Sequence, residues 1–143
     1  MHTIFWAGML CCSGMAELIT LYFHFSHDDL KKGQACPLEI TDSLRKYYPV
    51  EIYISFIMSA GFYFYRDYLA LMFCLPLVLY NIKMLIGKEF LCHAVFVEEY
   101  KQKDYMEKIS WIKALFHTGL IFYVVVQFIV YFSKFISYWV VSN

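Results

Sequence analysis

The feature that most constrains this chain is a long stretch without charged side chains near its C-terminus. Residues 114–133 contain no Lys, Arg, Asp or Glu. A helix needs about 20 mostly apolar residues to cross the roughly 30 Å hydrocarbon core of a bilayer. Hydrophobic residues also make up 61% of the 143-residue chain, against roughly 45–50% in a soluble domain. The sequence therefore predicts an integral membrane protein, with one domain at this length.

Two further apolar stretches precede this one. Residues 3–25 carry one formal charge, Glu17, and we expect them to form a retained membrane anchor. Residues 52–82 contain only the charges Arg66 and Asp67, which one continuous helix would place near the bilayer centre at about 2.5–3.5 kcal/mol each. A hairpin instead puts both at an interface beside Tyr65 and Tyr68. The sequence favours the hairpin, with a re-entrant pair that does not fully cross as the alternative.

The predicted fold is an all-α membrane protein with four transmembrane helices. The second and third form a short hairpin, and both termini are lumenal. The expected spans cover about residues 3–25, 50–65, 68–86 and 111–136 of a single domain, residues 1–143. Ten of the twelve basic residues fall in the two connectors on one side, leaving Arg66 and Lys134 opposite. Because cytosolic connectors are enriched in Lys and Arg, residues 26–50 and 83–113 are expected in the cytosol.

Composition argues against several classes of protein. Twelve basic and twelve acidic residues cancel, so the charge does not indicate nucleic acid as a partner. The five cysteines are an odd number without a CxxC pair, which argues against a disulfide scaffold or a zinc ribbon. Ser, His and Asp are not spaced as a nucleophile elbow or an ordered triad. We therefore expect no enzyme, no cofactor and no bound metal.

Short elements along the chain occur in a recognisable order. Asp29-Leu30 is followed by Pro37-Leu38-Glu39-Ile40 and then by Pro49-Val50-Glu51. Later come Leu75-Pro76, Tyr80-Asn81, Phe116-His117 and Phe122-Tyr123. This order resembles the cornichon family, the small cargo receptors of endoplasmic reticulum export. The resemblance assigns a structural role to the motif residues Asp29, Leu30, Pro37, Glu39, Glu51, Leu75, Pro76, Tyr80, Asn81 and Phe116.

The resemblance implies a receptor that selects transmembrane proteins for COPII vesicles travelling from the endoplasmic reticulum to the Golgi. It implies a multi-pass protein of the endoplasmic reticulum membrane and of these vesicles. The implied partners are the cargo-selecting subunit of the COPII coat, transmembrane cargo proteins and the lipid bilayer. The implied coat-binding residues are Val95, Phe96, Val97, Glu98, Glu99 and Tyr100. In this stretch the apolar half of the family pattern is kept and its basic character is lost.

Cargo contacts are expected within the membrane. Glu17 is an acid well inside a predicted span, and such acids indicate function by default. The structural alternative is that Gln127 or His117 of the last span is its partner, or that Glu17 is protonated and hydrogen-bonded. Rigid aromatic rings on the second span suit helix recognition, with core or lipid packing as the alternative. A kink at Pro76 either is accommodated by neighbouring helices or opens a lateral groove. The predicted cargo-binding residues are Glu17, Phe56, Phe62, Phe64 and Tyr65.

Three other functions remain as alternatives. A cornichon-like protein can act as an auxiliary subunit of a membrane channel or receptor. A small metal-dependent membrane enzyme would use the residues His24, His27, Asp28 and Asp29, completed by His93 or Glu98. A small transporter would need polar groups at mid-membrane, for which only Glu17, His117 and Gln127 are available.

Overall fold

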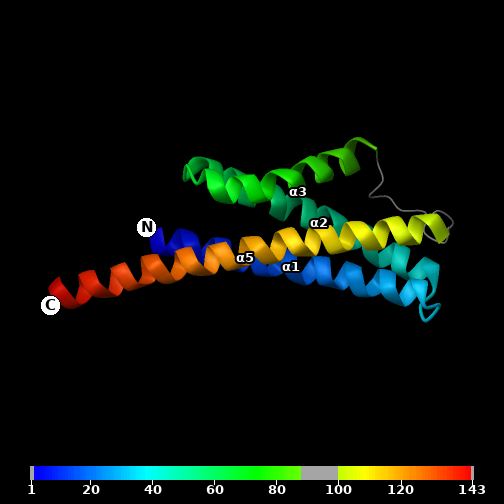
Figure 1. Cartoon of the computed structure of the whole chain (residues 1–143), viewed down its shortest axis with the longest axis horizontal. Coiled ribbons are helices and arrows are strands. Elements are labelled where there is room, and N and C mark those ends of the chain that lie inside the picture. Colours follow the sequence, from blue (N-terminus) through cyan, green and yellow to red (C-terminus); the bar gives the residue numbers. More distant parts are fainter. Residues whose placement is uncertain (1, 88–99, 143) are drawn as a thin grey trace.

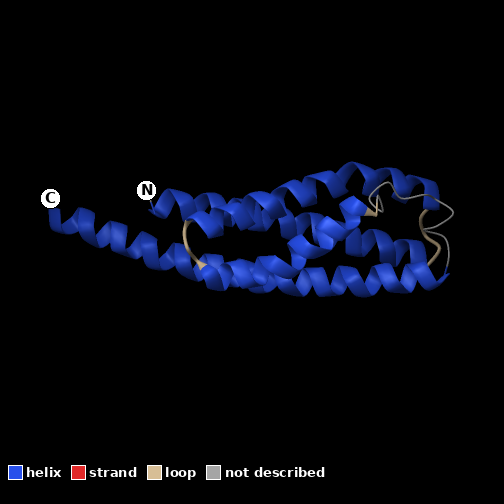
Figure 2. Cartoon of the chain, turned by 90° about the horizontal axis from the view of Figure 1, so that it is seen from above, coloured by secondary structure: helices blue, strands red, loops and turns tan. Residues whose placement is uncertain are grey.

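The computed structural model describes residues 2–87 and 100–142, and this part of the chain is all α-helical (Figure 1). Its four helices are α1 (His2–Lys31), α2 (Pro37–Phe64), α3 (Tyr68–Ile86) and α5 (Tyr100–Ser142). Figures 1 and 2 show α1 and α5 side by side along most of their length. With 43 residues at about 1.5 Å each, α5 is roughly 65 Å long. Its C-terminal end extends beyond the rest of the bundle (Figure 2).

Three of the described helices are long and apolar enough to cross a membrane. They are His2–Lys31, Tyr68–Ile86 and the Glu107–Ser142 part of α5. The second helix, α2, is 28 residues long but has a lower hydropathy, because it carries Pro49, Glu51 and several tyrosines. Helix α2 is therefore long enough to span a membrane. If it does so, its polar residues must be accommodated inside the bundle.

Helix α2 begins well before the predicted second span. Cys36, with extended backbone, is its N-cap, and Pro37 occupies the first helical position, where its fixed φ fits and no amide hydrogen is needed. Pro49 therefore lies inside the helix rather than at its start. The early turns are stabilised by burial, since Ile40 and Leu44 pack in a cluster with Phe23 of α1.

The predicted break between the second and third helices is confirmed. Helix α2 ends at Phe64 and α3 begins at Tyr68. Arg66 adopts a φ of 57°, a left-handed conformation that reverses the chain. Asp67 caps α3 by accepting a hydrogen bond from the Ala70 amide at 3.2 Å, as N-cap carboxylates do. Tyr123 of α5 donates a second hydrogen bond to Asp67, at 2.7 Å from Oδ2, so the turn is tied to the last helix.

The bundle has two apolar clusters, one on each side of its middle. The larger cluster joins all four described helices through the buried residues Trp6, Met9, Ala16, Ile54, Met58, Phe62, Ala70, Cys74, Leu120 and Val124. The smaller one joins α1, α2 and α3 through Phe23, Leu30, Ile40, Leu44, Tyr48 and Met84. Burial of these side chains positions the polar groups that lie between and beside the clusters.

Candidate functional site

A buried ion pair joins α2 to α5. Lys113 Nζ donates a hydrogen bond to Glu51 Oε1 at 2.8 Å, and the two side chains are 7% and 1% exposed. The ammonium also lies 4.6 Å from the ring centroid of Tyr80 and 5.6 Å from that of Tyr48. Ring faces carry partial negative charge and attract cations. Side chains from α2 and α3 together therefore stabilise the charge of Lys113.

Further polar side chains lie close to this ion pair. His117, one turn after Lys113 on α5, is 2% exposed and interacts electrostatically with Glu51 and Lys113. His27 of α1 is 4% exposed and also interacts with Lys113. Asn81 of α3, beside Tyr80 in the chain, is buried as well. Each described helix thus contributes a polar group to the interior of the bundle.

Lys113 lies where the second basic connector, residues 83–113, overlaps the predicted last span, residues 111–136. The structure buries its side chain within the bundle. The spacing of polar residues along the sequence identifies Lys113 as a buried residue. Ser110, Lys113 and His117 recur at three- and four-residue intervals and so share the buried face of α5.

Glu17 has a partner on α5, but not one of the residues considered from the sequence. Thr118 Oγ1 donates a hydrogen bond to Glu17 Oε1 at 3.0 Å. The expected partners were His117 and Gln127 of the same helix. His117 turns inward instead, and Thr118, the next residue, faces the junction of α1 and α5. That Glu17 would contact the last helix was predictable from the sequence. Which residue of α5 it would meet depends on the rotation of α5 about its axis, which was not predictable.

The predicted cargo-binding aromatic residues divide into two groups. Phe62 has no exposed surface and packs beside Trp6, with 6.2 Å between ring centroids. Tyr65 stacks on Phe5 at 4.0 Å. Both rings therefore serve packing between α1 and α2 in this structure. Phe56 and Phe64 face outward, with 38% and 83% of their surface exposed.

Two small cavities open on the sides of the bundle at helix prolines. One, of about 320 Å³, lies between α2 and α3 and is lined by Pro49, Ile52, Tyr53, Phe56 and Leu85. The other, of about 220 Å³, lies between α3 and α5 and is lined by Pro76, Leu77, Tyr80, Ile109, Ile112, Lys113 and Phe116. A proline removes one helical hydrogen bond and displaces the preceding turn, which is consistent with a cavity beside each.

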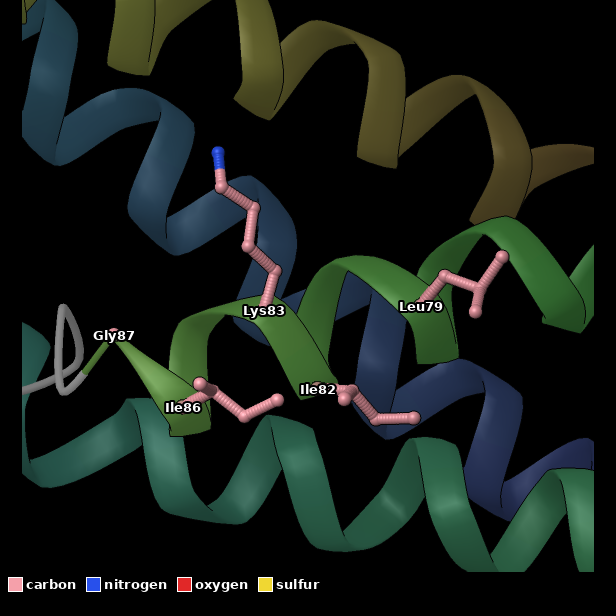
Figure 3. A pocket seen from close by; sticks show the side chains of 5 residues that line it. All are labelled: Leu79, Ile82, Lys83, Ile86 and Gly87. Carbon is pink, nitrogen blue, oxygen red and sulfur yellow. The ribbon is translucent and has the colours of Figure 1, made fainter.

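A third hollow lies along α3 and is shown in Figure 3. It has a volume of about 450 Å³ and is lined by Leu79, Ile82, Lys83, Ile86 and Gly87. Lys83 points away from Ile82 and Ile86 (Figure 3), and its ammonium lies 3.5 Å from the Tyr105 hydroxyl of α5. Its lining is thus aliphatic with one basic group at the edge.

The two histidines of the possible metal site have different neighbours. The ring of His24 packs against that of Trp111 on α5, with centroids 4.5 Å apart. His27 is buried and interacts electrostatically with Lys113. The pair is therefore used for helix packing in the arrangement described.

The carboxylates of the same segment are exposed or paired with a lysine. Asp28 Oδ2 accepts a hydrogen bond from Lys32 at 2.5 Å, which raises the pKa of Lys32, and Asp29 is exposed. Within residues 2–87 and 100–142, no three His, Cys, Asp or Glu side chains are grouped to hold a metal ion. His93 and Glu98, the proposed completing ligands, lie outside the described residues.

Comparison with known protein families adds a sequence-wide observation. The chain matches the family described as "Cornichon protein" over residues 3–126. The chain belongs to the cornichon family. It is accordingly a helical, multi-pass membrane protein and not an enzyme, because cornichon proteins are non-enzymatic cargo receptors. No curated protein and no solved structure matches it.

The cornichon motif residues take different positions in the bundle. Leu30, Glu51 and Asn81 are buried; Pro37, Tyr80 and Phe116 are half-buried; Asp29, Glu39, Leu75 and Pro76 are exposed. Two of the motif residues contact Lys113: the buried Glu51 forms an ion pair with it, and the half-buried Tyr80 ring lies beside its ammonium. The cornichon match also includes Glu17, Lys113 and Thr118, the polar residues that connect α1 and α2 to α5.

The predicted coat-binding stretch falls outside the part of the cornichon bundle that the structure describes. Val95, Phe96, Val97, Glu98 and Glu99 belong to this stretch. Tyr100 is the first residue of α5. The assignment of these residues stays a prediction from the family resemblance.

Proposed function

We propose that this chain is a cargo receptor that selects transmembrane proteins for COPII-coated vesicles moving from the endoplasmic reticulum to the Golgi. The observation that carries the proposal is the cornichon match, which extends from α1 into α5. The helical bundle supports it, because its apolar helices present wide surfaces to lipid and to other transmembrane helices.

In the proposed topology all four described helices cross the membrane, and both termini face the lumen. Helix α2 is included because the acid of its predicted span is neutralised internally: Glu51 pairs with Lys113 inside the bundle, so lipid does not meet the charge. The turn between α1 and α2 would then be cytosolic, and the turn at residues 65–67 lumenal. The concentration of Lys and Arg in residues 26–50 and 83–113, leaving out the buried Lys113, supports this orientation.

The proposed cargo-binding surface includes the outward-facing rings of α2. Phe64 is 83% exposed, and Phe56 is 38% exposed at the edge of the 320 Å³ cavity. A cavity of this size accommodates a large apolar side chain. Because lipid provides no hydrophobic drive for helix association, close packing of this kind is the main source of affinity. Phe62 and Tyr65 would support the surface from within.

The proposed coat-binding element is the stretch of residues 95–100 in the second connector. It would engage the cargo-selecting subunit of the coat from the cytosol. Each contact, to cargo and to coat, can be weak by itself. Many receptors clustered under one coat raise the effective concentration of binding sites, so modest affinities suffice for sorting.

A reconstituted budding assay tests the two surfaces separately. In the variant with Phe56→Ala and Phe64→Ala, packaging of transmembrane cargo should fall while the receptor itself still enters vesicles. In the variant with Val95→Ala, Phe96→Ala and Val97→Ala, both cargo and receptor should be left behind. Tyr138→Ala, which removes a ring about as exposed as Phe64 near the far end of α5, is the control. Unchanged cargo packaging in both variants would contradict the proposal, and residence at the cell surface would favour a channel subunit instead.

A further inference from the structure

A carboxylate lies halfway along the first membrane-spanning helix. Glu17 is close to the middle of α1, a helix of 30 residues, and so lies roughly 22 Å from either end at about 1.5 Å per residue. An acid at this depth is costly unless its oxygens are hydrogen-bonded. The hydrogen-bond partners of Glu17 therefore indicate its role.

Within the described structure, only one of the two Glu17 oxygens has a hydrogen-bond partner. Oε1 accepts from Thr118 at 3.0 Å, and Oε2 is buried and has no partner among residues 2–87 and 100–142. The side chain as a whole is partly exposed, and Thr118 is exposed. The terminal torsion of a glutamate is soft, so either oxygen can turn toward the outer surface of the bundle.

The surface around Glu17 has room for another helix. Gly14 lies one turn before Glu17 on the same side of α1, and a Cβ added at Gly14 would meet no atom within 4 Å. Small residues of this kind let a second backbone approach closely in a membrane. Leu115 and Phe122 lie one turn before and after Thr118 on α5, Leu18 follows Glu17 on α1, and all three side chains are exposed. We call this the Glu17 surface; it consists of Gly14, Glu17, Leu18, Leu115, Thr118 and Phe122.

Charge decides which partner fits the Glu17 surface. Lipid chains have no hydrogen-bond donor, and lipid headgroups lie at the interface rather than at mid-membrane. A second copy packed symmetrically through the same surface would place Glu17 against Glu17, a contact that is unfavourable while both carboxylates are ionised. A helix that carries a basic side chain at the same depth supplies both a donor and the complementary charge.

We propose that the Glu17 surface docks a partner transmembrane helix that carries Lys or Arg near mid-membrane, with the Glu17 carboxylate accepting its hydrogen bonds. Thr118 holds the carboxylate at the surface, and Gly14 admits the partner backbone. A neutral donor such as Asn binds more weakly, because it supplies the hydrogen bond without the charge. This inference rests on the proposed function for one point, that the partner is cargo.

Synthetic single-span helices test the charge preference directly. Leu-rich helices with Lys, Asn or Leu at the central position are reconstituted with the full chain in phosphatidylcholine vesicles, and association is followed by fluorescence energy transfer. The expected order of affinity is Lys, then Asn, then Leu, with the Lys helix about tenfold tighter than the Leu helix and the Asn helix about threefold tighter, as for interhelical hydrogen bonds.

Four variants show whether Glu17 is responsible. Glu17→Leu should abolish the order, and Glu17→Gln should remove the advantage of Lys over Asn while leaving the Asn helix within threefold of its wild-type affinity. Gly14→Leu should weaken all three helices by closing the approach. Glu39→Gln, an exposed acid in the first turn of α2, should change nothing. Circular dichroism and a monodisperse elution peak verify folding, and the nearly isosteric Glu17→Gln decides if Glu17→Leu does not fold.

The proposal is overturned if the three helices bind wild-type protein equally, or if the order survives in Glu17→Gln. Its failure is separable from that of the proposed function. If the helices associate in the expected order but cargo export does not depend on the chain, the proposed docking surface is retained and the proposed receptor function is refuted. If export depends on the chain but the three helices bind equally, the receptor function is retained and the docking surface is refuted.

Discussion

Single side chains in this bundle matter most where opposite charges meet inside it. Glu51 and Lys113 are both almost fully buried, and each is the other's main charge partner. Burying an ion is expensive, so removing one member leaves an unpaired charge that costs about 3–5 kcal/mol, whereas removing both is often nearly neutral. The pair therefore specifies how α2 is placed against α5 more than it adds stability.

This asymmetry gives a prediction at the residue scale. Glu51→Leu or Lys113→Leu alone should lower the thermal unfolding temperature of the detergent-purified protein strongly, in line with a loss of about 3–5 kcal/mol. The double variant should recover most of the loss, because no charge remains buried. Lys108→Leu, which removes an exposed lysine of the same helix, serves as control. A double variant as unstable as the two single ones would show that the ion pair is not the reason for the loss.

At the scale of helices, the packing of α1 on α2 depends on a close approach at Gly61. A Cβ added there would lie 3.2 Å from Met9 Sδ and 3.5 Å from the ring of Phe5. By contrast, a Cβ at Gly8 of α1 would meet nothing within 4 Å. The two glycines are thus a matched pair, one inside a helix contact and one facing outward.

We expect Gly61→Leu to destabilise the bundle by about 1–3 kcal/mol, the usual effect of overpacking, because Met9 and Phe5 must both move. Gly8→Leu should leave stability nearly unchanged. The measurement is the thermal unfolding temperature of each variant in the same detergent. Equal effects at the two positions would mean that α1 and α2 do not pack as described.

For the molecule as a whole, the proposed binding to a cytosolic coat requires that the basic connectors face the cytosol. The structure places the turn between α1 and α2 at one end of the bundle, and the turn at residues 65–67 toward the end that holds both termini (Figures 1 and 2). If α2 crosses the membrane, these two turns lie on opposite sides. Cys36, exposed in the first turn, provides a native chemical probe.

The prediction is that an impermeant maleimide added to sealed endoplasmic reticulum vesicles labels Cys36 at once. The protein used keeps Cys36 and has Cys11, Cys12, Cys74 and Cys92 replaced by alanine. A second protein has Cys36 replaced as well and carries Arg66→Cys; it should be labelled only after the vesicles are permeabilised. Labelling of both positions from the outside would mean that α2 and α3 form a re-entrant pair, and the four-span topology would have to be abandoned.

The membrane class and the break at Arg66-Asp67 were predictable because each depends on local composition. A run of apolar residues must be shielded from water wherever it occurs, and two adjacent charges in such a run favour an interface. The cornichon resemblance was likewise readable from short motifs, and the family match confirms it. The start of α2 at Pro37 was less predictable, since it depends on burial against α1.

Only the tertiary structure decided which polar groups meet and which rings face outward. Glu51 and Lys113 are 62 positions apart, and Glu17 and Thr118 are 101 apart, so no local pattern relates them. Phe62 and Phe64 are two residues apart in the same helix, yet one is buried and the other exposed. The reason is geometric: each helix is apolar around most of its circumference, and only the packing of its neighbours selects the face that turns inward.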